Sequence, residues 1–314
     1  MDCLKEQLKN VKELVPLAPY TTFKIGGAAR FFFVATARED VIQATRAATD
    51  CNVPFFVLAG GSNILISDDG FPGLVVLIKL GAYQITGTKV TAEAGVEMET
   101  LVKETGKLGL SGFEWAGGLP GSLGGAVRGN AGAFGGEIKD SIVSVTALDT
   151  KGNTRELSKE DCKFSYRSSM LKENKWIVLS ATFQLKEGDK KEIAGIAESH
   201  VEYRKEKHPL EYPNAGSMFK NCDVNLFTKE LQEQLKDVVK VDPFPVVPTA
   251  YLISEAKLKG LRKGDAQVST KHPNYMVNLG KATSKDVLEL LEDVKTAVRE
   301  KFSVELEEEV ELVS

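Results

Sequence analysis

A twenty-residue stretch rich in glycine constrains this chain more than any other feature. Nine of the 28 glycines fall between Gly117 and Gly136. Such a density is incompatible with the interior of an ordinary helix or strand, because each interior glycine costs about 0.5–1 kcal/mol relative to alanine. Glycine is favoured where φ must be positive or where backbone must approach a ligand closely, and exposed N–H groups in such turns bind anions.

A second, shorter glycine cluster follows the apolar run Pro54 to Leu58. It reads Ala59-Gly60-Gly61-Ser62-Asn63 and is typical of a phosphate loop at the carboxyl end of a strand. Tight connections between packed strands would explain a single Gly-Gly pair. Two separate clusters favour a bound cofactor instead.

The sequence excludes the common nucleotide motifs. It contains no G-x-G-x-x-G, no G-x-x-x-x-G-K-[ST], no H-E-x-x-H and no G-x-S-x-G. A pyrophosphate held by two separate glycine-rich loops is what a flavin fold outside the Rossmann class requires. The loops are therefore expected to follow another phosphate-binding design.

Charge and composition exclude several other classes. Forty Lys and Arg residues against 44 Asp and Glu give a net charge of -4, so no global basic excess indicates nucleic acid. No apolar run is long enough to span a bilayer, and the N-terminus lacks a signal-peptide core. The four cysteines are widely spaced, which indicates neither a disulfide framework nor a zinc site, and the three histidines lack metal-ligand spacing. A reduced, cytoplasmic protein without a metal is the expectation.

The length of 314 residues suggests about two domains. Periodicity predicts helices over 38–50, 97–108, 192–207, 227–239 and 284–302, and strands over 30–35, 53–58, 74–78, 141–149, 176–185 and 304–313. Thr283 and Asp286 form a capping pattern before the last helix. We place the domain boundary after residue 195, giving domains 1–195, with lobes of about 1–80 and 81–195, and 196–314.

Six sequence blocks, in this order, resemble one flavoenzyme family. They are Thr22–Gly27, Gly60–Asn63, Gly118–Ala126 with Asn130–Gly132, Tyr166-Arg167, Ala215–Asn221 and Leu306–Val310. The chain is similar, from about Tyr20 to its end, to the UDP-N-acetylenolpyruvoylglucosamine reductases (MurB family), which make a peptidoglycan precursor. Any one block alone would be a weak signal, whereas six in order are specific.

This resemblance implies a fold and an activity. The fold would be α+β: a two-lobed FAD-binding domain of the vanillyl-alcohol-oxidase (PCMH) type, followed by an α/β substrate-binding domain. NADPH would reduce non-covalent FAD, which would reduce UDP-N-acetylglucosamine-enolpyruvate to UDP-N-acetylmuramate, in cell wall biogenesis, cell shape and cell division. The partner would be a small-molecule UDP-sugar, with no nucleic acid and no membrane insertion, and the protein would be a monomer.

The resemblance also carries over site residues. For cofactor binding it implies Gly60, Gly61, Ser62, Asn63, Gly118, Pro120, Gly121, Ser122, Gly124, Gly125, Asn130, Ala131 and Gly132. Two departures lie in these loops: Ala59 stands where the family often has a third glycine, and Arg128-Gly129 replaces a bulkier apolar pair. A third, Cys222, replaces a proline after Asn221.

Three residues are the expected catalytic group. Hydride addition to an enol ether conjugated to a carboxylate needs a fixed cation at the carboxylate and a proton source at C2. The resemblance assigns Arg167 as the cation, Ser217 as the proton donor and Glu309 as an assisting group. From the residues alone, a surface arginine, a serine bonding its own turn and a solvated acidic face would be the simpler interpretations.

Substrate contacts and two competing functions complete the expectations. Lys220, Asn221 and Arg204 are expected to contact the UDP-sugar, whereas His272 is expected to be structural.

Two other functions are alternatives to the reductase: a flavin oxidase of the same superfold, which should lack the Ser217 and Glu309 blocks, and a non-catalytic UDP-sugar-binding relative. Because no histidine precedes His200, histidyl attachment of flavin within the loops is not expected.

Overall fold

The computed structural model describes residues 3–242 and 244–314, in two compact units. The first unit comprises the residues up to 15, 29–60 and 71–203, and the second comprises 16–28, 61–70 and 204–314. The boundary expected after residue 195 falls inside helix α6 (Lys190–Lys207), which continues without a break. Segments 16–28 and 61–70 group with the second unit. The assignment of one domain to FAD and the other to substrate stays a prediction.

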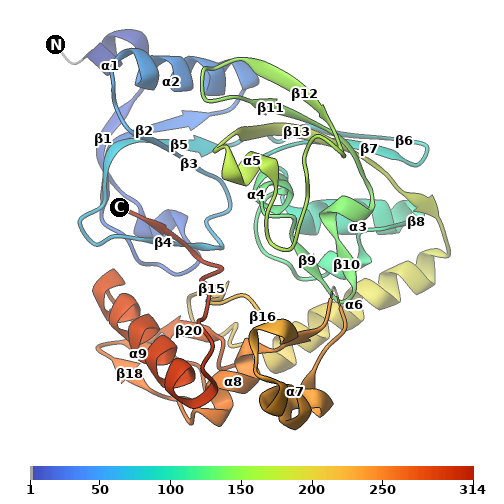
Figure 1. The fold of residues 1–314 in the computed structure, drawn as a ribbon. Coiled ribbons are helices and arrows are strands. Elements are labelled where there is room, and N and C mark those ends of the chain that lie inside the picture. The colour runs from blue at the N-terminus through green and yellow to red at the C-terminus, as the bar shows by residue number, and fades with distance from the viewer. Residues whose placement is uncertain (1–2, 243) are drawn as a thin grey trace. The chain divides into compact units, whose positions relative to one another are not determined.

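The first sheet of the first unit is built around a buried parallel strand. Its order is β1 (Lys12–Pro16), β2 (Ala28–Ala35), β5 (Phe71–Ile78) and β3 (Phe55–Leu58), and β5 runs parallel to both β2 and β3. Residues Gly73 to Ile78 are buried, as a fully covered strand requires. Helix α2 (Arg38–Asp50) packs on this sheet through Val41, Ala44 and Ala48 (Figure 1). Its bounds match the predicted helix.

The N-terminal helix corrects one expectation from the cysteine spacing. Helix α1 (Cys3–Gln7) lies beside α2 and brings Cys3 to Cys51, which follows the last residue of α2, and the two form a disulfide with a Cα–Cα distance of 5.8 Å. The spacing of the two cysteines in the sequence does not indicate this pair. They meet because Leu4 and Leu8 pack into the core and bring Cys3 close to Cys51. Cys162 and Cys222 are free and buried.

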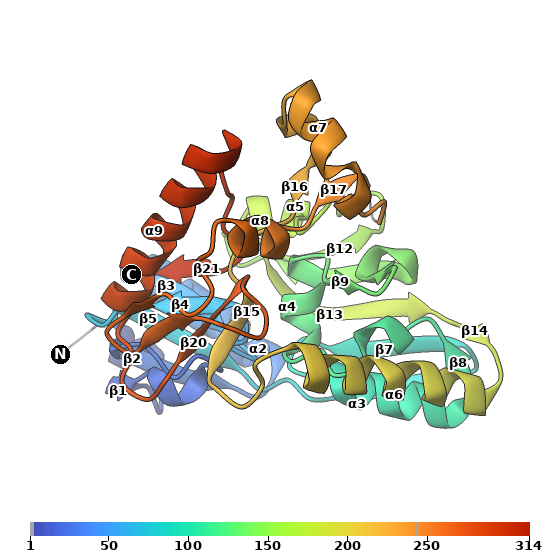
Figure 2. The same ribbon diagram turned by 90° about the horizontal axis from the view of Figure 1, so that it is seen from below.

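The second sheet is antiparallel, and a helix from the glycine-rich run packs on it. Its order is β12 (Thr154–Ser158), β11 (Ile142–Leu148), β13 (Ile177–Gln184), β7 (Lys89–Glu93) and β6 (Tyr83–Thr86). Helix α4 (Leu123–Arg128) packs on β13 and β7, and α6 runs beside α3 (Met98–Leu108), where Gly106 faces Ile193 (Figure 2). The remaining elements are β8 (Leu110–Ser111), β9 (Gly132–Ala133), β10 (Gly136–Glu137), β14 (Lys186–Glu187) and α5 (Met170–Glu173).

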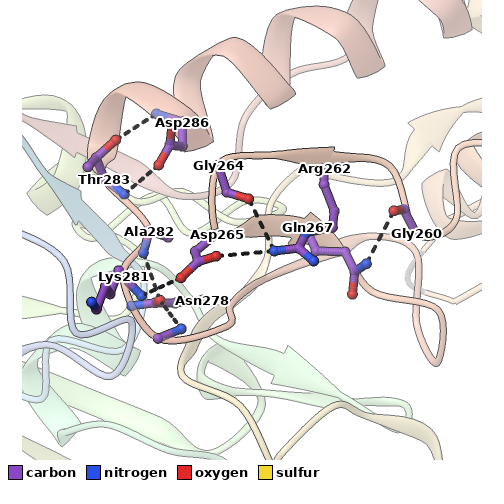
Figure 3. A network of polar contacts seen from close by, with 11 residues as sticks. Gly260, Arg262, Gly264, Asp265, Gln267, Asn278, Lys281, Ala282, Thr283 and Asp286 are labelled. Atoms are coloured by element: carbon purple, nitrogen blue, oxygen red, sulfur yellow. Dashed lines mark hydrogen bonds and ion pairs between the residues drawn. The ribbon is translucent and has the colours of Figure 1, made fainter.

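The second unit packs helices on a small sheet of order β15 (Asn214–Ser217), β20 (Tyr275–Asn278), β19 (Ala266–Val268) and β18 (Arg262–Lys263). Helix α9 (Ser284–Phe302) packs on β18 and β19 and begins at the expected cap. Thr283 Oγ1 accepts from the Asp286 N–H, and Asp286 accepts from the Thr283 N–H (Figure 3). In the same network Asp265 accepts from Arg262 at 3.1 Å and from the Lys281 N–H at 3.0 Å, which anchors the loop that leads into α9.

Two predicted elements of this unit are shorter than expected. The helix expected over 227–239 is α7 (Lys229–Leu235), flanked by the 3-10 turns η4 (Val224–Leu226) and η5 (Lys236–Val238). Of the expected strand 304–313, only β21 (Glu311–Val313) is strand, paired in parallel with β4 (Ile64–Ile66). The other elements are β16 (Cys222–Asp223), β17 (Val246–Val247), α8 (Thr249–Glu255), η1 (Ala18–Tyr20) and, in the first unit, η2 (Glu114–Ala116) and η3 (Ile138–Asp140).

None of the helices within the described residues combines the length and apolar character that a membrane crossing needs.

Candidate active site

Within the first unit, Gly60 of the shorter glycine cluster approaches Gly121 of the longer run backbone to backbone. A Cβ placed on Gly60 would lie 2.6 Å from Gly121 Cα and 3.0 Å from Ser122 N. Side chains are therefore excluded at this crossing. The end of β3 and the loop before α4 thus form one backbone surface, as a shared phosphate site requires.

The loop before α4 presents groups that suit an anion. Gly118 and Gly121 have φ of 68° and 108°, values that favour glycine, and Gly118 and Pro120 are exposed. Ser122 occupies the N-cap of α4 without capping it, and its buried Oγ has no hydrogen-bond partner among the described residues. A buried hydroxyl without a partner is costly, so it indicates a bound polar group. Gly125, on the same helix, is exposed.

Several glycines of the run are explained by packing alone. A Cβ on Gly124 would lie 2.8 Å from Ala94 Cβ, and one on Gly136 would lie 2.5 Å from the Trp115 ring. Gly132 pairs with Glu137 in the β9–β10 hairpin, with Ala131 just before it. The simpler interpretation, tight connections between packed elements, therefore holds for part of the run, and the cofactor contacts expected of its residues stay predictions.

Asn130 connects the glycine run to the turn that carries Arg167. It is fully buried, with φ of 43°, and its amide nitrogen donates to Glu137 Oε2 at 2.6 Å and to the Ser165 carbonyl at 3.0 Å. Its oxygen accepts from the Lys139 N–H at 3.0 Å. These three hydrogen bonds, all within the protein, fix the orientation of the Asn130 side chain. Asn130 therefore joins the glycine-rich run to the Arg167 turn. The cofactor contact expected for Asn130 stays a prediction.

Arg167 lies at the tip of a tight turn. Ser165 and Ser168 exchange backbone hydrogen bonds of 3.0 and 3.2 Å, which leaves Tyr166 and Arg167 as the two central residues. Arg167 has φ of 55°, a left-handed value that costs energy for a residue with a side chain and is enriched at functional sites. Its guanidinium lies 5.2 Å from the centroid of the Tyr166 ring. Ser169 ties the turn to α4, since its Oγ donates to the Arg128 carbonyl at 2.6 Å.

In the second unit, Ser217 lies on a β-bulge. Asn214 pairs with Val277 and Ser217 pairs with Tyr275, so two residues of β15 oppose one residue of β20. Gly216 within the bulge has φ of 79°, and no heavy atom of the described residues lies within 4 Å of the position its Cβ would take. A bulge redirects the side chain that follows it. Ser217 is partly exposed beside this open position.

Glu309 lies against the same segment. Its backbone N–H donates to the Met218 carbonyl at 2.8 Å, and Glu308 bridges Phe219. Glu305 and Glu307 are exposed, whereas Glu309 is partly buried. The structure therefore brings Ser217 and Glu309 onto adjacent backbone segments, and Glu309 shares its partial burial with Glu308 and Glu311.

The expected substrate residues have varied surroundings. Lys220 forms an ion pair with Glu307 and donates its N–H to the Glu307 carbonyl at 2.9 Å. The Asn221 side-chain oxygen accepts from the Thr249 N–H at 3.2 Å. Arg204, near the end of α6, is only 7% exposed, which is uncommon for arginine and indicates a specific polar environment.

Loop residues 61–63 belong to the second unit. The Gly61 carbonyl accepts from the Thr22 N–H at 3.0 Å, and Gly61 has φ of 59°. Ser62 is partly exposed and Asn63 is exposed. The Asn63 amide nitrogen donates to the Glu309 carbonyl at 2.9 Å, so the loop and the tail are fixed together.

A buried aromatic cluster beside Ser217 was not expected from the sequence. The Tyr275 hydroxyl lies 3.0 Å from His208 Nδ1, and the His272 ring centroid lies 4.8 Å from that of Tyr275. Burial lowers the pKa of His208 and of His272 to about 4, and it raises the pKa of Tyr275 to about 12. The motif Lys271-His272-Pro-Asn274-Tyr275 was the available signal, but only the fold shows that it adjoins Ser217.

Comparison with known proteins identifies the family. Residues 29–158 match the model of an FAD-binding domain, and residues 208–313 match that of the UDP-N-acetylenolpyruvoylglucosamine reductase C-terminal domain. The UDP-N-acetylenolpyruvoylglucosamine reductase of Clostridium novyi is 41% identical over 310 residues, covering 98% of this chain and 93% of that protein. The chain belongs to the UDP-N-acetylenolpyruvoylglucosamine reductase family. The reductase of Carboxydothermus hydrogenoformans is also 41% identical, over 99% of this chain and 98% of its own length.

A solved structure supports the same assignment. The UDP-N-acetylenolpyruvylglucosamine reductase of Thermus caldophilus superposes with a TM-score of 0.77 at 34% identity, covering 96% of this chain and 98% of that one. The expected α+β class is confirmed by this reductase fold and by the FAD-binding-domain match. The individual site residues stay predictions.

Proposed function

We propose that this protein catalyses the reduction of UDP-N-acetylglucosamine-enolpyruvate to UDP-N-acetylmuramate, with FAD as cofactor and NADPH as reductant. The observation that carries the proposal is the 41% identity to a reductase of this activity over 98% of the chain. The FAD-binding-domain match over residues 29–158 supports the cofactor.

The residues of the first unit fit a bound flavin diphosphate. The backbone crossing of Gly60 and Gly121 and the unpartnered Oγ of Ser122 provide the close approach and the hydrogen bond that a phosphate needs. Bound FAD would supply the redox centre that accepts hydride from NADPH and donates it to C3 of the enolpyruvyl group. We propose non-covalent binding, because the free thiols of Cys162 and Cys222 are buried and His200, which stacks on Phe134 of the glycine-rich run, has its Nδ1 2.9 Å from the Glu114 carbonyl.

Arg167 is assigned to the carboxylate of the enolpyruvyl group. Negative charge grows on C2 and on this carboxylate as the hydride arrives at C3. A guanidinium forms two parallel hydrogen bonds to a carboxylate and does not lose its charge near neutral pH. The turn of Ser165–Ser168, fixed by Asn130 and Ser169, holds Arg167 in place before the charge develops.

Ser217 is assigned to deliver the proton to C2. A serine hydroxyl is a weak acid, but the enolate that develops at C2 is a strong base, so the transfer is feasible where water is scarce. The bulge at Ala215-Gly216 presents the hydroxyl at an open position. Glu309, hydrogen-bonded through its backbone to the neighbouring Met218, is assigned to assist this step.

We further propose that the protein acts as a monomer in the cytoplasm. NADPH and nucleotide sugars are intracellular metabolites, which supports this location. Lys220, Asn221 and Arg204 are assigned to the UDP-sugar. Arg204 supplies a nearly buried positive charge suited to a diphosphate or carboxylate.

The test separates the reductase from its two alternatives. Purified protein should be yellow, should bleach anaerobically with NADPH, and should recover its colour when UDP-N-acetylglucosamine-enolpyruvate is added. UDP-N-acetylglucosamine, which lacks the double bond, is the control and should not restore the colour. Reoxidation by oxygen that is faster than reoxidation by the enolpyruvyl sugar would favour an oxidase, and colourless protein that cannot be reconstituted with FAD would favour a non-catalytic binding protein.

A further inference from the structure

The two residues that follow Ser217, Met218 and Phe219, are held by Asn274 and Glu309. Asn274 forms two hydrogen bonds with the backbone of Phe219, accepting from its N–H at 3.1 Å and donating to its carbonyl at 2.8 Å. The Asn274 carbonyl accepts from the Met218 N–H at 2.8 Å. The Glu309 N–H donates to the Met218 carbonyl at 2.8 Å. These bonds fix the backbone around Ser217 but leave its side chain to its neighbours.

Tyr275 is the direct cross-strand neighbour of Ser217. The two are register partners in the antiparallel pair β15–β20, and directly opposite residues project from the same face with Cβ atoms about 4.5–5.5 Å apart. Tyr275 is 7% exposed. The buried Tyr275 side chain is therefore the cross-strand neighbour of the partly exposed Ser217.

His208 fixes the far end of the Tyr275 ring. The phenol hydroxyl and His208 Nδ1 are 3.0 Å apart, and the His272 ring packs edge-on against both aromatic groups, with centroid distances of 4.8 Å to Tyr275 and 5.2 Å to His208. Both imidazoles are neutral near pH 7, because burial lowers the pKa of each to about 4. The hydrogen bond thus joins two uncharged groups and does not depend on a proton that is lost near neutrality.

His208 is also hydrogen-bonded to the backbone of Arg204. Its backbone N–H donates to the Arg204 carbonyl at 2.8 Å, which extends α6 by one residue and places the two residues one helical turn apart. The positive charge of Arg204 helps to lower the pKa of His208 and opposes the rise in the pKa of Tyr275, while Glu309 adds to that rise. The Tyr275 hydroxyl therefore lies within electrostatic reach of both Arg204 and Glu309.

We propose that Tyr275 and His208 are positioning residues, which act as a pair to hold the Ser217 hydroxyl in its productive orientation relative to Arg204. This inference rests on the function proposed above, since it assigns a purpose to the pair only if Ser217 donates a proton. Neither residue is assigned to contact the reacting atoms. The pair acts through the β15–β20 register and the end of α6.

The experiment is a double-mutant cycle on the FAD-loaded protein. Tyr275→Phe removes only the hydroxyl and should slow reoxidation by UDP-N-acetylglucosamine-enolpyruvate about tenfold at saturating substrate. In the Ser217→Ala background the same change should slow reoxidation less than about twofold, because no hydroxyl is left to orient. His208→Asn, whose amide can replace Nδ1, should retain more activity than His208→Ala. Tyr251→Phe, in a tyrosine that packs elsewhere on the core of the same unit, is the matched control and should match wild type.

The outcomes separate this inference from the proposed function. Flavin content and the rate of FAD reduction by NADPH report on folding and should stay unchanged in every variant. Equal slowing by Tyr275→Phe in both backgrounds, or wild-type reoxidation in Tyr275→Phe, would overturn the positioning role. Where Tyr275→Phe fails to retain FAD, the contrast between His208→Asn and His208→Ala decides. A wild-type protein that NADPH reduces but the enolpyruvyl sugar does not reoxidise would instead overturn the proposed function.

Discussion

The side-chain amide of Asn63 donates a 2.9 Å hydrogen bond to the backbone carbonyl of Glu309, across 246 residues of sequence. The Glu311 N–H returns a bond of 3.0 Å to the Asn63 carbonyl, and the parallel pair β4–β21 begins with Ile64 opposite Glu311. The end of a loop expected to bind cofactor is thereby fixed to the acidic tail. The position of Glu309 is consequently set by two neighbours, Asn63 and Met218.

Gly60→Ala should weaken FAD binding by about tenfold or more. The new Cβ would lie 2.6 Å from Gly121 Cα, a backbone atom that cannot rotate away, so one of the two loops must move. Overpacking of this kind costs about 1–3 kcal/mol, and 1.4 kcal/mol is tenfold in affinity. Reconstitution of apoprotein with FAD, followed by absorbance, gives the dissociation constant. Gly195→Ala on α6, where the Cβ meets no atom within 4 Å, is the control, and equal FAD affinity in both variants would contradict the prediction.

Ser217→Ala should separate the two half-reactions. FAD reduction by NADPH should remain near the wild-type rate, because the hydroxyl is assigned only to protonation of C2. Reoxidation by the enolpyruvyl substrate should slow by at least ~10², the lower range for loss of a general acid. Anaerobic stopped-flow absorbance measures both rates. Equal slowing of the two half-reactions would remove Ser217 from proton delivery.

Local sequence signals were sufficient for the elements that depend on local chemistry. Helices α2 and α9 have the predicted bounds, because an amphipathic pattern and, for α9, a capping pair at Thr283 and Asp286 define both. The tail was different. Its alternating pattern predicted one strand over 304–313, but residues 307–309 bond to 218–220, whereas only 311–313 pair with β4. Pattern alone does not indicate which partner each half of a segment will find.

The sequence predicted which kinds of residue form the candidate site, but not which residues contact one another there. The glycine clusters indicated close backbone approach, which the crossing of Gly60 and Gly121 realises. The inward-facing bonds of Asn130, the turn that gives Arg167 its left-handed backbone and the pairing of Ser217 with Tyr275 all depend on long-range packing. Contacts between residues far apart in the sequence produce no periodic pattern from which they could be predicted.

Acidification should destabilise the folded protein through His208 and His272. Burial, with His272, Arg204 and Lys271 near His208 and with Lys240 and Lys259 near His272, lowers both pKa values to about 4 from 6.5. Between pH 6.5 and 4 the unfolded chain binds more protons than the folded one, so the free energy of unfolding falls as pH is lowered through this window. Urea unfolding at about pH 7.5 and about pH 5 measures the loss. His272→Gln, which cannot titrate, should lose less, and an identical pH dependence in this variant would refute the assignment to His272.

Reduction of the disulfide between Cys3 and Cys51 should destabilise the first unit. The bond closes a loop with a sequence separation of 48 residues and anchors α1 to the end of α2. Constraint of the unfolded chain by a loop of this length is typically worth about 2–4 kcal/mol. Urea unfolding with and without dithiothreitol measures the difference. Cys51→Ser is the control, since it should already be destabilised and should not respond to the reductant; a wild-type protein equally stable under both conditions would count against the prediction.

Arg167→Lys should lower kcat for the enolpyruvyl half-reaction as well as raise KM. Lysine keeps the charge but lacks the planar pair of donors that fits a carboxylate. If Arg167 stabilises charge that grows during hydride transfer, the loss must appear in kcat, because only interactions stronger in the transition state affect it. Loss of one preorganised donor typically costs about 3–4 kcal/mol, so Arg167→Ala should lose the full effect and Arg167→Lys part of it.

The backbone at Arg167 requires a matched control for this comparison. Its φ of 55° is strained for any residue with a side chain, and lysine, alanine and arginine share that strain, so differences among the three variants report on the side chain alone. Lys163, with φ of 45° in the same unit, offers a control in Lys163→Ala, which should leave both half-reactions unchanged. An exposed arginine without a catalytic role would predict wild-type kcat in both Arg167 variants, and that result would exclude Arg167 from the active site.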